Sequence, residues 1–94
     1  MEFREIIKQI KDFGQSLDLY WSNAIAGEVG EYCNLIKKFN RGDIKTDLDF
    51  KKFRIDISNE LADIFIYLVL NARFHLIDLE SAILNKIQIV NKRK

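Results

Sequence analysis

Four carboxylates stand in stretches of the sequence that are otherwise apolar. Glu28 and Glu31 are three residues apart in one predicted helix, and Glu60 and Asp63 have the same spacing in another. Residues three apart lie on one face of a helix, so each pair projects to one side. Carboxylates that are buried together repel one another unless a cation compensates them. The pattern therefore favours a metal site, whereas a single such pair is also common on a solvated helix face.

The donor types indicate which cation this would be. The sequence offers no group of His or Cys residues that would make the cation zinc, whereas four hard oxygen donors suit Mg²⁺ or Mn²⁺. Mg²⁺ tends to share its coordination shell with substrate phosphates. We therefore expect Mg²⁺, with Mn²⁺ as the alternative, and chemistry at a phosphate ester or phosphoanhydride.

Two glycines alternate with the first acidic pair. Gly27 and Gly30 lie inside the predicted helix, where each costs about 1 kcal/mol relative to alanine. This cost predicts a close approach to the helix, either by a neighbouring helix or by a ligand.

The elements that must position these residues are helices. The chain has no proline and four glycines in 94 residues, which favours a few long elements over many turns. Apolar residues recur at helical spacing over 2–12, 17–39, 50–74 and from 78 almost to the end, with a loop at 40–49. Thr46 with Asp49, and Asp78, are the expected helix caps. The sequence predicts one all-α domain over 1–94, resembling a four-helix bundle.

The apolar pattern also predicts a partner. The third helix is apolar on nearly all sides, and we expect it to be buried on most of them. We expect the fourth helix to turn Leu79, Ile83, Ile87 and Val90 inward. A chain of this length cannot easily cover all these faces alone. We therefore expect a homodimer with its interface near the second and third helices.

Composition excludes other classes. With 15 Lys and Arg against 14 Asp and Glu, the chain lacks the positive field of a non-specific nucleic-acid binder. The longest apolar run, at 64–70, is too short for a membrane span, and no apolar leader opens the chain. A single cysteine fits a cytoplasmic protein. We expect no nucleic-acid partner and no membrane.

Two segments together resemble the MazG-like nucleotide pyrophosphohydrolases. These are AIAGEVGE at 24–31 and NELADIFIYL at 59–68, which follow the family pattern E-x-x-E, spacer, E-x-x-D. In this chain 28 residues separate Glu31 from Glu60. The similarity runs from 21 to 93.

The resemblance implies an all-α fold completed by homodimerisation, in some relatives a tetramer. It implies Mg²⁺-dependent hydrolysis of a nucleoside or deoxynucleoside triphosphate to monophosphate and pyrophosphate, as in nucleotide-pool house-cleaning. Glu28, Glu31, Glu60 and Asp63 match the metal ligands, and we favour Glu31 to orient the attacking water as well.

The resemblance also suggests substrate contacts. Tyr67 matches a position that touches substrate in relatives. Lys86 and Arg93 match the ends of a phosphate-holding K-x-x-x-N-x-x-R pattern, although Val90 replaces its Asn. Trp21 would border the base pocket, with core packing or a dimer contact as the alternative. Lys38 lies on the same helix stripe as Glu28 and Glu31 and could reach a phosphate.

Two other functions stay open at this stage. One is a non-catalytic MazG-like module for protein interaction or regulation. The other is a related enzyme on the same fold, specific for phosphoribosyl-ATP or dUTP. The sequence does not indicate which base or sugar is preferred.

Overall fold

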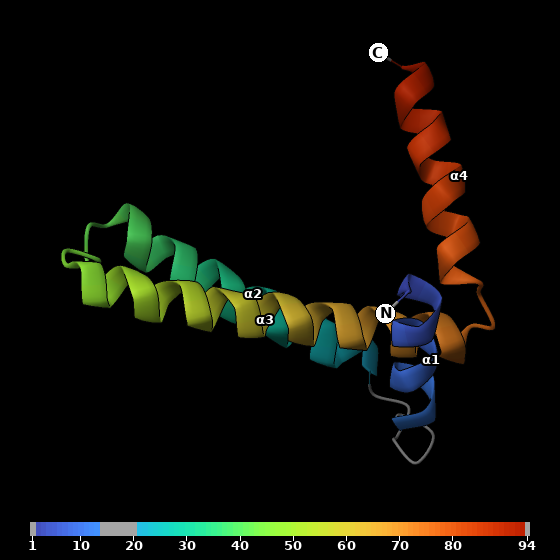
Figure 1. The fold of residues 1–94 in the computed structure, drawn as a ribbon, viewed down its shortest axis with the longest axis horizontal. Helices are drawn as coiled ribbons and strands as arrows, with labels where there is room; N and C mark the ends of the chain where they lie inside the picture. Colours follow the sequence, from blue (N-terminus) through green and yellow to red (C-terminus); the bar gives the residue numbers. More distant parts are fainter. Residues whose placement is uncertain (1, 14–20, 94) are drawn as a thin grey trace. The chain divides into compact units, whose positions relative to one another are not determined.

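The computed structural model describes residues 2–13 and 21–93. These residues form four helices, α1 (Phe3–Phe13), α2 (Trp21–Asn40), α3 (Asp47–Phe74) and α4 (Leu79–Lys92) (Figure 1). No strand occurs in the ranges described. The prediction of an all-α chain is confirmed. The first residues predicted for the second helix, 17–20, lie outside the described part.

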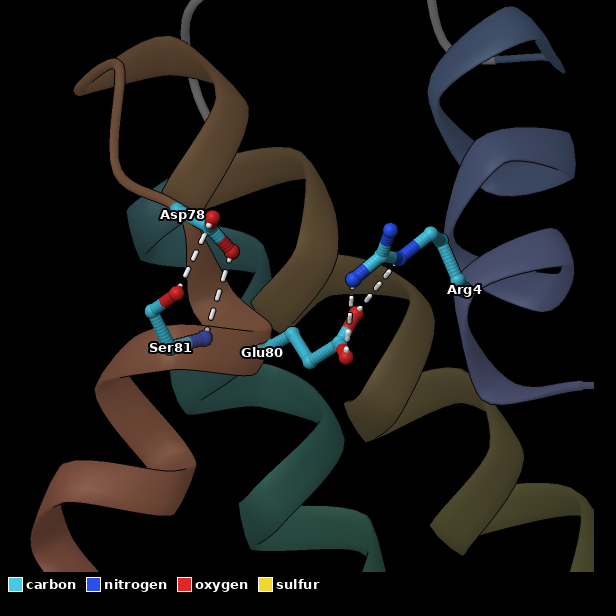
Figure 2. Close-up of polar contacts among 4 residues, drawn as sticks. All are labelled: Arg4, Asp78, Glu80 and Ser81. Atoms are coloured by element: carbon cyan, nitrogen blue, oxygen red, sulfur yellow. Dashed lines mark hydrogen bonds and ion pairs between the residues drawn. The ribbon is translucent and has the colours of Figure 1, made fainter.

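Side-chain caps determine where α3 and α4 begin. The Thr46 hydroxyl accepts a hydrogen bond from the backbone N–H of Asp49 at 3.0 Å, so α3 starts three residues before the predicted residue 50. Asp78 accepts bonds from the backbone N–H and the hydroxyl of Ser81, at 3.2 and 3.1 Å (Figure 2). Both predicted caps are confirmed.

The chain divides into two compact units, which are described separately. One contains α2 and α3 as far as Leu68, and the other contains α1, the end of α3 and α4. In the first unit α2 and α3 form an antiparallel hairpin (Figure 1). Phe39 and Phe53 stack at 5.2 Å between ring centroids near its loop, with Phe50 beside Phe53. This contact joins the two helices near the loop.

The buried side chains of the second unit come from α1 and the end of α3. They are Ile7, Ile10, Val69, Leu70 and Ala72. In the same unit Arg4 forms a two-pronged ion pair with Glu80, at 3.2 and 3.3 Å (Figure 2). Because the Arg4 side chain is 80% exposed, this pair adds little stability.

The single chain does not provide the burial predicted for the third and fourth helices, which we expect a homodimer to complete. Only Val69, Leu70 and Ala72 of α3 are buried, and α4 has no buried residue. On α4, Ile87 is 49% exposed and Val90 41% exposed. Helical periodicity identifies an apolar face of a helix, but it does not show which part of the structure packs against that face. None of the described helices is long and apolar enough to cross a membrane.

Candidate active site

The α2–α3 hairpin brings together three of the four carboxylates selected from the sequence. Glu28 comes from α2, and Glu60 and Asp63 come from consecutive turns of α3. One carboxylate oxygen from each lies within 4.8 Å of the other two. We call these three residues the acidic cluster.

Two oxygens of the acidic cluster lack a hydrogen-bond donor. Glu28 Oε2 and Glu60 Oε2 are buried, and neither has a partner among the residues that the structure describes. A buried carboxylate oxygen without a partner is unfavourable, because it has lost its hydrogen bonds to water and no donor in the protein replaces them. A divalent cation held by hard oxygen donors would supply the missing interaction. The residues present therefore fit a metal ion.

Mutual repulsion is visible in the electrostatics of Glu60. Burial, together with the neighbouring carboxylates of Glu28 and Glu31, raises the pKa of this carboxyl from 4.5 to about 7. Glu31 thus lies close enough to Glu60 to affect its protonation. It is exposed and does not belong to the group of three.

An open hollow adjoins the acidic cluster. It has a volume of about 290 Å³ and is lined by residues of α2 and α3, namely Glu31, Asn34, Leu35, Lys38, Asp56, Asn59 and Glu60. We call it the side hollow. Lys38 is thereby placed beside Glu31 and Glu60. Sequence reasoning did not select Asn34, Asp56 or Asn59 as site residues. Asp56 lies one turn before Glu60 on α3, and this helical spacing is the signal that points to it.

The other predicted substrate residues are spread over both units, and one of them is not described at its side chain. Tyr67 is half-buried one turn after Asp63. Lys86 and Arg93 are exposed residues of the second unit, where Arg93 caps the end of α4. Trp21 is the first residue of α2, and its side chain lies outside the described part.

The expected close approach to Gly27 and Gly30 is absent from the described chain. A Cβ atom added at either glycine would have no described neighbour within 4 Å. Packing of the described helices therefore does not explain these two residues.

Comparison with known families agrees with the acidic pattern and the helical fold. The chain matches the model of the MazG nucleotide pyrophosphohydrolase domain over residues 18–94. Neither a curated protein nor a solved structure matches it. Because the family match covers most of the sequence, the chain belongs to the MazG nucleotide pyrophosphohydrolase family.

Proposed function

We propose that this protein hydrolyses a nucleoside or deoxynucleoside triphosphate to the monophosphate and pyrophosphate. Family membership supports nucleotide pyrophosphohydrolase activity in general. The observation that carries the specific proposal is the acidic cluster, with buried, unpartnered oxygens on Glu28 and Glu60. Such a cluster is suited to a cation that also contacts phosphates.

Glu28, Glu60 and Asp63 would hold this cation, Mg²⁺ or alternatively Mn²⁺. When bound, it would neutralise charge on the triphosphate and make a nearby water more acidic. The protein contributes the rigid spacing of the three carboxylates, since each lies on a helix of one hairpin.

Glu31, which the sequence also predicts as a metal ligand, is suited to a second task. It lies beside Glu60 but outside the group of three, and it is exposed. We assign it to orient the attacking water and to accept its proton. Water would attack the α-phosphorus, the bond from this phosphorus to the bridging oxygen would break, and pyrophosphate would leave.

Cationic and hydroxyl side chains would hold the phosphates. Lys38 is near the acidic cluster through the side hollow, and Tyr67 follows Asp63 by one turn. We assign Lys86 and Arg93 to offset negative charge, and Trp21 to the border of the base pocket. These three assignments rest on the family resemblance.

We further propose that the protein acts as a homodimer. Large apolar side chains are exposed on α3 and α4, among them Ile55 at 60% and Leu84 at 55%. Full burial of such a side chain is worth about 1.5–3 kcal/mol. The open space at Gly27 and Gly30 would also admit a helix of a second copy.

Neutralising the acidic residues one at a time tests the assignment. Glu28→Gln, Glu31→Gln, Glu60→Gln and Asp63→Asn should each lower metal-dependent pyrophosphate release by at least about 100-fold, the scale of a lost acid–base or charge-stabilising group. Glu5→Gln, at an exposed carboxylate of α1, is the matched control and should retain full activity. Full activity in all four site variants would exclude the proposed site.

A further inference from the structure

The side hollow is adjacent to the acidic cluster, because Glu60 belongs to both and Glu31 lines the hollow. A nucleotide whose phosphates lie at the acidic cluster would therefore have the hollow within reach. At about 290 Å³ it is at the lower limit of ligand pockets, which run from roughly 300 to 1,000 Å³. A nucleobase ring system fits within this volume.

The charge of the side hollow disfavours a second phosphate site. Its lining includes three carboxylates, Glu31, Asp56 and Glu60, against the single cation Lys38. A polyanion such as pyrophosphate would meet net negative charge there. The other polar side chains are the neutral amides of Asn34 and Asn59, which both donate and accept hydrogen bonds. The lining suits a neutral group with several polar edges.

Asp56 determines which kind of polar group on a ligand would fit the side hollow. It is half-buried, and it has no hydrogen-bond or ion-pair partner among residues 2–13 and 21–93. An ionised carboxylate only accepts hydrogen bonds. An exocyclic amino group of a base is the matching donor, as when Asp or Glu accepts from the amino group of cytosine. A carbonyl oxygen in the same place would leave two acceptors facing each other without a donor.

We infer that the side hollow is a nucleobase subsite in which Asp56 selects bases that carry an exocyclic amino group, with Asn34 and Asn59 completing the hydrogen bonding. The inference rests on the proposed function and extends it to substrate class. It replaces the assignment of Trp21 to the base pocket, because Trp21 precedes Asn34 by 13 residues of α2, about 20 Å along the helix axis. Asp56 is a specificity-determining residue, not a metal ligand.

Cytosine and uracil give the sharpest comparison, because at ring position 4 one carries an amino group and the other an oxygen. The protein should hydrolyse CTP with a kcat/KM roughly tenfold or more above that for UTP, the scale for one well-placed hydrogen-bonded pair. Asp56→Asn should remove or reverse this ratio, because an amide can donate to the oxygen of uracil. Asp47→Asn, an exposed carboxylate on the same helix outside the hollow, should keep the ratio. An unchanged ratio in Asp56→Asn would overturn the inference.

A binding measurement separates failure of this inference from failure of the proposed function. The side-chain amide signals of Asn34 and Asn59 are followed by NMR while CMP, UMP or pyrophosphate is added in the presence of Mg²⁺. Shifts with CMP and not with UMP would support the subsite even if no triphosphate were hydrolysed. Equal shifts with CMP and UMP, no shifts with either, or shifts with pyrophosphate alone would each contradict it.

Discussion

Glu60 links the proposed site to pH. Its pKa is about 7 in the folded chain, against an ordinary value of 4.5, because burial and the neighbouring carboxylates disfavour its charge. Between these two values the folded chain holds a proton that the unfolded chain releases. The stability contributed by this proton is therefore present below about pH 4.5 and is lost as the pH rises to about 7.

We predict that, in EDTA, the melting temperature of the chain falls from pH 5 to pH 8 more steeply than that of Glu60→Gln. Added Mg²⁺ should raise the melting temperature more at pH 8 than at pH 5, because the cation competes with the proton. Thermal melts at both pH values, with and without Mg²⁺, measure both effects. Parallel pH profiles for the chain and for Glu60→Gln would show that Glu60 is not perturbed.

The sequence could predict which carboxylates share a helix face, but not which of their oxygen atoms lie close together in the fold. Three-residue spacing places Glu28 and Glu31 on one face of α2 whatever α2 packs against. The group of three that includes Glu28 and leaves out Glu31 depends on the register between α2 and α3. That register involves contacts between the two helices, such as that of Phe39 with Phe53, which no local pattern encodes.

Two helix ends of the same geometry carry different residues. At the end of α2, Gly42 has φ +85°. The N–H of Asp43 donates to the carbonyl of Lys38, and the N–H of Gly42 donates to the carbonyl of Phe39. At the end of α3 the same pair of bonds runs from Ile77 to Ala72 and from Leu76 to Arg73, with Leu76 at φ +58°. Both are Schellman caps, and the left-handed residue of such a cap is usually glycine.

We predict that Leu76→Gly raises the free energy of unfolding by about 1 kcal/mol, because it removes the clash of a side chain held at positive φ. The Leu76 side chain is 94% exposed, so little packing is lost with it. Leu76→Ala is the matched control, since it shortens the side chain but keeps the Cβ atom, and it should leave stability nearly unchanged. Denaturant unfolding compares the three proteins, and an equal gain in both variants would contradict the explanation.

Helix boundaries could be predicted to within a few residues, and their errors have local causes. Periodicity located α1 within one residue at each end, at Phe3–Phe13 against the expected 2–12. α3 begins at Asp47 and not at the expected residue 50, because the Thr46 cap starts the helix one turn before the apolar pattern becomes regular.

The exposed apolar side of α4 bears on whether the protein is a monomer or a dimer. Ile83, Ile87 and Val90 recur at helical spacing and are 36%, 49% and 41% exposed. Their periodicity could be read from the sequence. What covers them could not, because a face that packs against a second chain has the same pattern as one that packs within the chain.

We predict that folding and dimerisation are coupled, so the melting temperature rises with protein concentration. Ile87→Lys, on the exposed apolar side of α4 that we add to the proposed interface at α3, should lose this dependence and the dimer in sedimentation and should unfold or aggregate, because a lysine would be buried in the interface and folding needs the partner. Gln88→Lys, next to it on an exposed position of α4, should keep both properties. Sedimentation showing a stable 11.1 kDa monomer at micromolar concentration would contradict the dimer.

The central claim is that the acidic cluster supports metal-dependent cleavage between the α- and β-phosphates. The most direct measurement incubates the protein with CTP, UTP, ATP and GTP, with Mg²⁺ or with EDTA, and quantifies both products. We predict equal amounts of nucleoside monophosphate and pyrophosphate from at least one nucleotide, released only with the metal and not by Glu60→Gln. No pyrophosphate from any nucleotide with Mg²⁺ or Mn²⁺, or equal release with EDTA, would contradict the account.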